Sequence, residues 1–553
     1  MFSQNSSLRH PTAGRASLAL LAAMMFNAEA YATPSAPAAA APTSYAVKAK
    51  SYGTHPETDP PRYVRNLAAT SIAAFDSLDW IDAGLDFRER IEFRHNDLRR
   101  PFLATDENFL HRTRAYFGIR EILDPFRFAV EFEDSRASNS ECAEDTRDFN
   151  KYELIQGYVE LNFKGALGED ARGNQRPIRF RAGRMSWESV DRRLLGNNQW
   201  RNTTNNHEGF RLNFGQEAND WEVDLWGVQP VLRDIDEFDT RNRDVWFYGG
   251  ILNWRRWSDV VTLQPYYMGL KQRARGTLVA REIHSPGLRG YGVIPGTALD
   301  FDLGALYQFG RDGGRQKSAW AYLLEFGYTL PHAWKPRVSA FYAYASGDRD
   351  PDDGNDNRFE RFFGFARPWS ADDNIVFENV RTPKLKLELE PRKGLSFDGG
   401  YAWYWLASDR DRFNNLLNGI NGDNRFNRDR SGRSGDFLGQ SIDARVRFNV
   451  TSRIETTIGY SHWINGGFTQ TRQRAALGET TDSTDFLYVE ISLNAFEARW
   501  CAGFPTCSFR WSPRSGPRIP LTPSSPRAVI DGLEADVVRL ALAFDIDAIA
   551  EYG

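Results

Sequence analysis

The chain has 553 residues, a formal net charge of −4 and a pI of about 6.2, so no overall basic field indicates a nucleic-acid partner. Its mean hydropathy is −0.55 and no long apolar run follows residue 35, which excludes a bundle of transmembrane helices. Aromatic residues make up 14% of the chain, and only ten of its 69 basic residues are Lys. Arginine pairs well with carboxylates, although GC-rich codon usage would produce the same bias.

Residues 1–32 have the form of a secretory signal peptide, because basic residues precede the apolar run 16–26 and small residues follow it. Residues 33–79 are interpreted as a linker and N-terminal segment. This segment is rich in Ala, Pro and Ser up to about residue 60 and shows no pattern that would form a core there. We therefore expect the mature protein to be exported.

Apolar and polar residues alternate from about residue 80 onward, beginning with the segment 81–94. Successive side chains of a strand point to opposite faces, so each such segment has one apolar and one charged face. The segments with clear alternation are 81–94, 109–120, 126–133, 155–163, 178–184, 210–214, 221–225, 301–309, 320–330, 385–389, 442–448 and 487–493. Weaker alternation marks 246–254, 260–270, 283–292, 337–344, 395–406 and 454–464. The sequence thus predicts about eighteen strands.

A soluble sandwich and a transmembrane barrel both use this alternation, but several features favour the barrel. Sandwiches rarely hold this many strands. Aromatic residues cluster near strand ends, as at 401–405, and short turns alternate with long polar loops such as 346–373 and 407–436. We predict an all-β fold, a single transmembrane antiparallel β-barrel of about 18 strands over 80–496 with long extracellular loops. Its apolar face would contact lipid of the outer membrane of a Gram-negative bacterium.

The end of the barrel has two interpretations. The segment 484–496 finishes in Phe496, as the last strand of such barrels commonly does, although its apolar face is one residue out of phase. Residues 497–553 form a tail of uncertain structure in which alternation returns at 538–544. We favour closure near residue 496, and a further strand from the tail is the alternative.

The most unusual stretch is FRAGRMSWESVDRRLLGNNQWRN, residues 180–202. It carries five arginines between Arg181 and Arg201, and the regular alternation ends near Gly183. The sequence leaves open whether the four arginines after Gly183 belong to a loop folded into the pore or stand outside it.

With the residues that follow it, this stretch resembles the alginate-export family of outer-membrane barrels. The similar motifs, in order, are Arg181-Ala182-Gly183-Arg184, Arg193-Leu194-Leu195-Gly196, Gln199-Trp200-Arg201-Asn202 and Glu208-Gly209-Phe210-Arg211-Leu212. Met185 replaces the usual Gln, and His207-Glu208 replaces Phe-Asp. The resemblance runs from about residue 80 to 496. It implies an eighteen-stranded barrel that passes a polyanionic uronate such as alginate outward through an arginine-rich constriction, with periplasmic secretion proteins as further partners.

The residues expected to line the conduit are mostly arginines on polar strand faces, because guanidinium groups pair bidentately with carboxylates. They are Arg88, Arg90, Arg112, Arg114, Arg181, Arg184, Arg201, Arg211, Arg289 and Arg445, with Asp191, Glu208 and Asp443 as their carboxylate partners. Each arginine either contacts the substrate or braces the barrel wall against an acidic neighbour, and the sequence leaves both roles open. The alternative functions are a general or anion-selective uptake porin and a barrel whose loops act in adhesion.

Signatures of catalysis are scarce, so the chain is not expected to be an enzyme or to hold a cofactor or metal. The eight His lack metal-ligand spacing, and no phosphate-binding loop is present. Ser461 and His462 are adjacent in a strand and therefore point to opposite faces. The Asp-rich run 348–356 is read as a solvated loop, with divalent-cation binding as the alternative.

Overall fold

The computed structural model describes residues 44–46, 57–70, 72–98, 102–142, 144–197, 199–350, 352–364, 370–413 and 427–496. The predicted signal peptide and the tail from residue 497 lie outside these ranges, as does the segment 538–544. Among the described residues no helix is long and apolar enough to cross a membrane.

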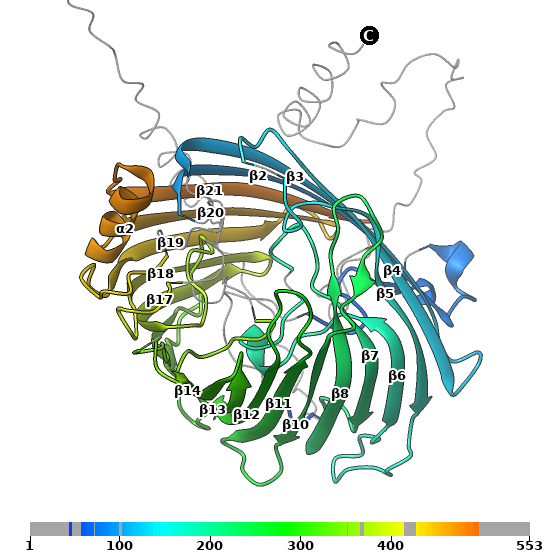
Figure 1. Cartoon of the computed structure of the whole chain (residues 1–553). Coiled ribbons are helices and arrows are strands. Elements are labelled where there is room, and N and C mark those ends of the chain that lie inside the picture. Colours follow the sequence, from blue (N-terminus) through cyan, green and yellow to red (C-terminus); the bar gives the residue numbers. More distant parts are fainter. Residues whose placement is uncertain are drawn as a thin grey trace, which may run out of the picture. The chain divides into compact units, whose positions relative to one another are not determined.

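Eighteen long antiparallel strands form a closed ring (Figure 1). They are β2 (Ile81–Asp97), β3 (Phe102–Ile119), β4 (Phe126–Ser138), β5 (Asn150–Phe163), β6 (Ile178–Met185), β7 (His207–Phe214), β8 (Trp221–Leu232), β10 (Val245–Trp254), β11 (Thr262–Gln272), β12 (Arg281–Val293), β13 (Leu299–Asp312), β14 (Arg315–Thr329), β15 (Arg337–Ala345), β17 (Val380–Arg392), β18 (Leu395–Trp405), β19 (Phe437–Asn449), β20 (Ile454–Asn465) and β21 (Ser483–Asn494). Each pairs with the next in chain order, and β21 pairs with β2, which closes the ring. The all-β barrel of about 18 strands is confirmed.

Shorter elements complete the described part of the chain. The strand β1 (Arg65–Asn66) pairs with β2, β9 (Thr240–Arg241) pairs with β8, and β16 (Asn355–Asp356) lies parallel to β14. The helical elements are α2 (Gly467–Leu477) and the 3-10 turns η1 (Leu67–Ala69), η2 (Ala73–Phe75) and η3 (Val190–Arg192).

The two faces of the strands differ as the alternation predicts. Large apolar side chains such as Phe87, Phe117 and Leu385 are exposed on the outside of the ring, whereas Arg88 and Glu133 are buried inside it. Apolar groups are more stable out of water. A ring with an apolar exterior and a charged interior is therefore suited to a lipid bilayer around it.

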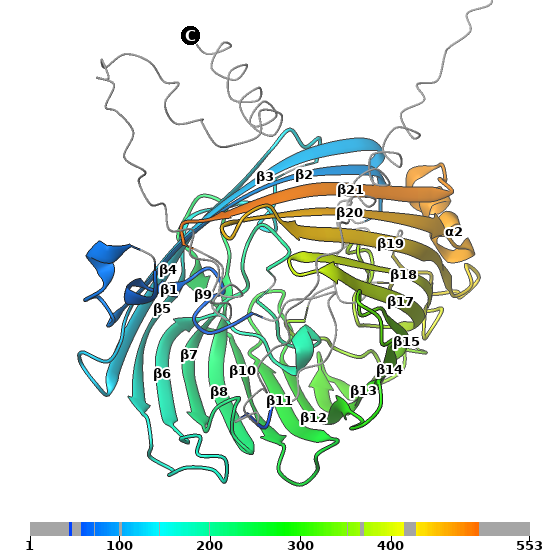
Figure 2. The same cartoon turned by 180° about the vertical axis from the view of Figure 1, so that it is seen from behind.

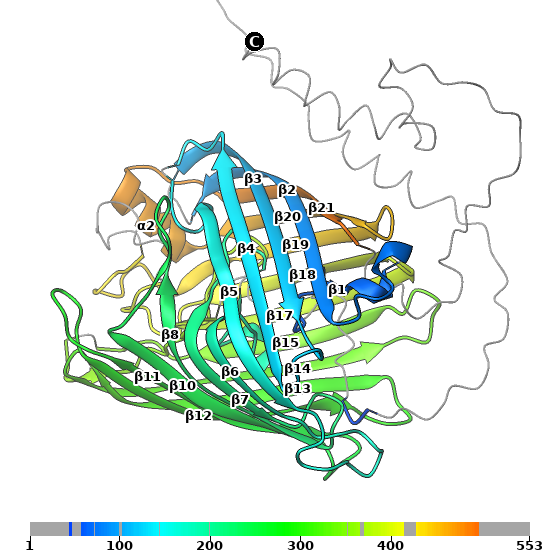
Figure 3. The same cartoon turned by 90° about the vertical axis from the view of Figure 1, so that its right-hand side faces the viewer.

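The two ends of the barrel are unequal. One end carries most of the long connections, including 186–206, 346–379 and 406–436, and we call it the long-loop end. The other end has connections as short as 393–394 and 450–453, and we call it the short-turn end. Figure 3 shows α2 and β1 at opposite ends of the strands, α2 with the long loops and β1 with the short turns.

Two expectations about single residues are corrected. The alternation in 155–163 predicts that Ile155 lies on the apolar outer face with Val159 and Leu161, but it is 1% exposed. A register irregularity pairs Glu131 with Gln156 and Phe132 with Leu154, so that Ile155 is displaced from the alternation as in a β-bulge. Arg184 was expected beyond the regular strand, but β6 continues to Met185 and Arg184 is paired with Glu208.

The interior is not uniformly polar. A cluster of buried apolar side chains fills the space between strands β6–β15 and two long loops, 186–206 and 346–379. Strands contribute Met185, Val228, Phe247, Met268, Ile283 and Ala321, and the loops contribute Trp187, Leu194, Leu195, Phe359 and Phe362. The cluster continues along the next strands through Val380, Ala402, Tyr404, Leu438 and Trp463, so apolar packing also reaches the wall from β17 to β20.

Candidate functional site, a charged cavity inside the barrel

The loop 186–206, between β6 and β7, crosses the inside of the barrel. Arg193 in this loop binds Asp302 of β13, with 2.6 Å between Nη2 and Oδ2. Gln199, further along the same loop, accepts a hydrogen bond of 2.5 Å from Arg114 of β3. Figure 2 shows the teal turn η3 of this loop inside the ring of strands. The question that the sequence left open is answered, because the loop folds into the barrel.

Arginines of β2 hold this loop through its backbone. Arg88 donates hydrogen bonds of 2.9 Å to the carbonyl oxygens of Gln199 and Arg201. Arg90 donates to the carbonyl of Trp200 at 2.5 Å and lies over its indole ring, 4.0 Å from the centroid. A loop inside a barrel has carbonyl groups without sheet partners, and a buried carbonyl without a hydrogen bond is costly. These guanidinium groups supply the missing donors.

Arg112 and Arg114 of β3 complete the attachment. Arg112 donates to the carbonyl of Gln199 at 3.1 Å. Arg114 binds Glu133 at 2.8 Å and donates to the hydroxyl of Thr204 at 2.5 Å. The side chain of Thr204 in turn donates to Glu133 at 2.7 Å. The arginine-rich wall of β2 and β3 therefore fastens the loop as well as facing the lumen.

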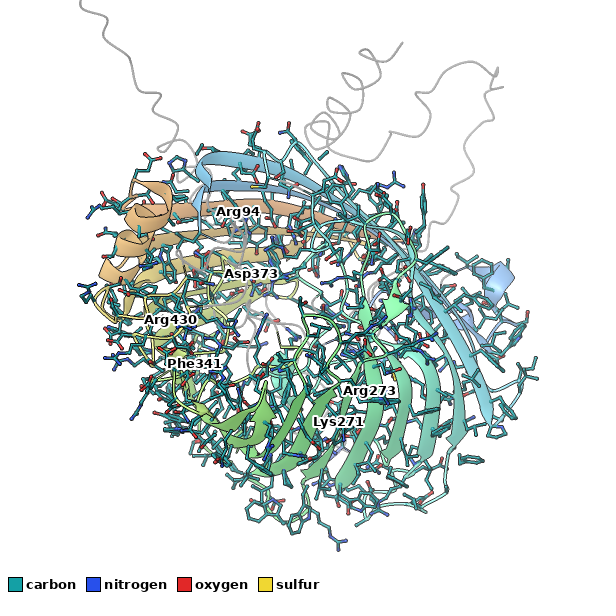
Figure 4. All side chains as sticks on the ribbon, viewed as in Figure 1. Arg94, Lys271, Arg273, Phe341, Asp373 and Arg430 are labelled. Carbon is teal, nitrogen blue, oxygen red and sulfur yellow. The ribbon has the colours of Figure 1, made fainter. Side chains whose placement is uncertain are left out.

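A second loop, 346–379 between β15 and β17, lies beside the first. The backbone N–H of Phe363 donates to the carbonyl of Leu194 at 2.9 Å, which joins the two loops. Arg94 of β2 donates to the carbonyl of Asp372 at 3.2 Å. Asp373 is 3.8 Å from the guanidinium of Arg201. Figure 4 labels Arg94 on the wall and Asp373 towards the middle of the ring.

The two loops leave a cavity of about 700 Å³ against the arc of strands from β17 through β21 to β2 and β3. Its other surfaces come from loop residues such as Trp200 and Ala371 and from the N-terminal segment at Glu57–Tyr63. Nine basic and eight acidic side chains line it. The basic ones are spread along the arc, from Lys384 on β17 through Arg445 on β19 to Arg112 on β3.

Four of the predicted arginines reach this cavity, namely Arg88, Arg112, Arg114 and Arg445. Arg445 binds Asp398 of the neighbouring strand at 3.0 Å. The other predicted arginines do not line the cavity and are paired with carboxylates: Arg90 with Glu92 and Glu490, Arg181 with Glu160, Arg184 with Glu153, Arg201 with Asp373, Arg211 with Asp224, and Arg289 with Asp302. Bracing of the wall and loops is thus the role that these contacts support.

Of the predicted carboxylate partners, Glu208 lies beside a predicted arginine, whereas Asp443 is paired with a lysine. Asp443 lines the cavity, but its basic partner is Lys384 at 3.0 Å and not an arginine. Glu208 is 3.6 Å from Arg184 and 3.3 Å from Arg241. The side chain of Asp191 lies outside the described part of the structure.

Sequence reasoning missed the basic residues at the β17 end of the cavity. Lys384 and Lys386 stand on the polar face of a strand that the alternation predicted, and Arg447 stands on another. The predicted lining residues were mainly arginines, so these two lysines were not included. Sequence reasoning also passed over Glu57–Tyr63, whose sequence has no strand pattern that would place it inside a barrel.

A buried carboxyl lies where the second loop meets the wall. Burial and the neighbouring charge of Asp443 raise the pKa of Asp372 to about 6. Its backbone carbonyl accepts from Arg94, and its side chain accepts from the amide of Asn374 at 2.9 Å and lies 3.5 Å from the hydroxyl of Ser461. The docking of this loop is therefore sensitive to protonation of Asp372.

The contacts of Ser461 and His462 agree with the prediction that these side chains point to opposite faces of the strand. Ser461 donates to Asp443 at 2.8 Å inside the barrel, whereas His462 lies 2.8 Å from Asp485, which is half-buried. In the described ranges, no group of three or more His, Cys, Asp or Glu side chains is placed to hold a metal ion.

The sequence profile described as alginate export matches residues 79–482, and the chain belongs to this family. No curated protein sequence matches it. Among solved structures, Pseudomonas aeruginosa OccK8 (OprE) is similar with 14% identity, 75% of this chain and 98% of that chain covered, and a TM-score of 0.49. Acinetobacter baumannii OccAB1 has 12% identity, coverage of 78% and 99%, and a TM-score of 0.49. Pseudomonas aeruginosa OccD3 (OpdP) has 12% identity, coverage of 82% and 98%, and a TM-score of 0.48.

Family membership and the closed barrel define a channel of the Gram-negative outer membrane. In such barrels the short turns face the periplasm and the long loops face the cell exterior. The short-turn end is accordingly periplasmic, and the loops 186–206 and 346–379 enter the lumen from the extracellular end.

Proposed function

We propose that this channel passes an anionic, alginate-like polyuronate outward through the charged cavity. The observation that carries the proposal is the series of basic side chains along the arc that lines the cavity, with Arg445 and Arg447 on β19 in its middle. Lys384 and Lys386 stand on β17, and Arg88 and Arg112 stand on β2 and β3. A uronate chain presents one carboxylate per sugar, so a chain along the arc would meet successive cations.

The acidic residues of the cavity are consistent with passage of a polymer. Lys384 is shared with Asp443 at 3.0 Å, and Lys386 with Glu325 at 2.7 Å. A carboxylate of the polymer would have to replace Asp443 or Glu325 as the partner of the lysine. It would therefore be bound more weakly than by a lysine that has no acidic neighbour. Conduction requires sites weak enough to release what they bind, and such exchange supplies them.

Ion selectivity in planar bilayers tests this proposal. We expect the native channel to prefer anions and uronate oligomers to reduce its current. The double variant Lys384→Gln with Lys386→Gln should lower both the anion preference and the oligomer block, because it removes two positive charges from the cavity wall. A matched control is Lys271→Gln with Lys335→Gln, since both side chains are exposed away from the cavity. Cation preference in the native channel would refute the selectivity.

An uptake porin selective for small anions is the second candidate, because the same cavity would serve it. Secretion distinguishes the two functions. A strain that lacks the gene and makes the polymer should retain it in the periplasm if the channel exports. Neighbouring genes for polymerisation and epimerisation would favour export, and catabolic genes would favour uptake.

A further inference from the structure

The N-terminal segment 57–66 enters the short-turn end of the barrel. Its last two residues form β1, in which Arg65 and Asn66 pair with Ala83 and Asp82 of β2. The pairing of β2 with β21 begins only at Asp86, so β1 occupies a stretch of β2 that β21 leaves open. The sheet edge therefore provides a backbone anchor for the segment.

The residues before β1 are bound to the inner wall by side chains. Asp59 contacts Arg181 of β6 at 2.8 Å, and the hydroxyl of Tyr63 donates to Glu131 of β4 at 2.7 Å. Burial opposes ionisation of Asp59, but the charges of Arg181, Arg211 and Arg179 outweigh it and hold the pKa of Asp59 below its ordinary value. The segment is thus held by an ion pair and a buried hydrogen bond to two different strands.

A glycine in the wall makes room for this segment. A Cβ atom at Gly84 of β2 would lie 2.7 Å from Cδ2 of Tyr63 and 3.0 Å from Cα of Val64. The side chain of Tyr63 is 8% exposed and that of Val64 is fully buried. Any side chain at position 84 would therefore push against both the ring of Tyr63 and the backbone of the segment.

The segment also forms a surface of the charged cavity. Glu57, Thr58, Arg62 and Tyr63 line it, and the backbone N–H of Glu57 donates to Glu188 of the first inward loop at 3.2 Å. The cavity is consequently enclosed by the wall, the inward loops and this N-terminal segment, which approaches from the periplasmic end.

We propose that residues 57–66 are a displaceable strap that closes the periplasmic side of the cavity and limits conduction until it moves aside. Its buried apolar residues are Pro61, Tyr63 and Val64, and its contacts with Arg181 and Glu131 are polar, so we assign it to the class of segments that open locally without unfolding the protein. The strap would restrict any solute, whatever the channel carries. Only the statement that the strap controls export of a polymer rests on the proposed function.

Conductance in potassium chloride tests the strap without any polymer. In Gly84→Ala, the new Cβ collides with the strap, and the open-channel conductance should rise severalfold above that of the native channel. The control Gly304→Ala adds a Cβ on β13 whose nearest neighbour is Nη1 of Arg193 at 3.8 Å, an ordinary contact, and it should leave conductance unchanged. Deletion of residues 57–66 should reproduce the rise. Native conductance in the deletion variant would overturn the proposal.

Locking the strap provides the opposite test. Arg65 and Ala83 are directly opposed in an antiparallel pair. Such residues have Cα atoms about 4.5 to 5.5 Å apart, which a disulfide can bridge. In a chain with Cys142, Cys501 and Cys507 changed to Ser, the pair Arg65→Cys and Ala83→Cys should show lower conductance when oxidised and recovery when reduced. Equal conductance in both states would contradict displacement.

These outcomes separate the strap from the proposed function. Heat-dependent mobility in detergent gels, measured for every variant, reports whether the barrel itself has formed. If the deletion variant conducts as the native channel does but uronate oligomers still block it, the strap proposal fails and the polyuronate channel stands. If conductance rises in the deletion variant but uronate oligomers have no effect, the strap proposal stands and the polyuronate channel fails.

Discussion

At the scale of single residues, the arginines of β2 and β3 act chiefly through the loop that they hold. Arg88 and Arg112 donate to carbonyl oxygens of Gln199 and Arg201, and Arg114 is shared between Glu133 and Thr204. Hydrogen bonds from charged donors are stronger than neutral ones, and their loss leaves buried carbonyls unsatisfied. The main role of the guanidinium groups in this wall is therefore to hold the loop in place.

The pH dependence of the second loop is predicted from Asp372. Its pKa of about 6 exceeds the ordinary value, so the docked loop binds a proton more readily than the released loop and is most stable at low pH. Docking should weaken by about 1 kcal/mol as the pH rises from 5 to 7.5, which follows from the 1.36 kcal/mol per pKa unit. Hydrogen exchange of the amides of 370–379, corrected for intrinsic rates, measures this change.

The variant Asp372→Asn provides the comparison. The amide keeps the size of the carboxyl but does not ionise, so the pH dependence of exchange in 370–379 should disappear. Exchange in β6, which pairs with β5 and β7 on another part of the ring (Figure 1), serves as an internal reference in the same experiment. A pH dependence that persists in Asp372→Asn would show that another group controls the loop.

At the scale of elements, the inward loop 186–206 contributes both to the buried apolar cluster and to the surface of the charged cavity. Its apolar residues Leu194 and Leu195 belong to the buried cluster, whereas Gln199 and the aromatic Trp200 border the cavity. The strands behind the apolar packing present apolar residues on both faces. This explains why 246–254 and 260–270 showed only weak alternation in the sequence.

Loosening this loop should enlarge the channel. The double variant Arg88→Met with Arg112→Met removes the donors to the carbonyls of Gln199 and Arg201, while Met approximates the length of the side chain. We expect higher single-channel conductance and more frequent current fluctuations, as measured in planar bilayers. The control Arg120→Met removes an arginine that pairs with Asp82 and is 37% exposed. Unchanged conductance in the double variant would mean that other contacts suffice to hold the loop.

At the scale of the whole molecule, the barrel depends on one long-range pairing. The first long strand β2 pairs with the last, β21, along Asp86–His95. In a bilayer the open edges of a sheet have no water to bind, so each unpaired backbone group costs several kcal/mol. Ring closure is therefore a condition of stability in the membrane.

Truncation tests where the barrel ends. A chain that stops after residue 496 retains β21, and we expect it to refold in detergent with the heat-dependent gel mobility of a closed barrel. A chain that stops after residue 482 lacks β21 and leaves edges on β2 and β20, so it should fail to reach that state. Failure of the longer chain would instead assign a structural part to the residues beyond 496.

The sequence alone was sufficient for the number of strands and the orientation of their faces, because the period of two is a local property that each segment displays. The four family motifs quoted above also lie close together, within 181–212. Ile155 escaped this reasoning because a bulge depends on the register of the neighbouring strand.

The tertiary structure decided which charged residues are exposed to the cavity and which are used to hold the molecule together. Arg193 meets Asp302 across 109 residues of sequence, and Arg90 meets Glu490 across 400. The placement of the loop 186–206 and of the strap 57–66 likewise depends on partners such as Arg114 and Gly84 on distant strands. Alternation specifies only the face on which a side chain lies, whereas its partner is specified by the closed ring that brings distant strands together.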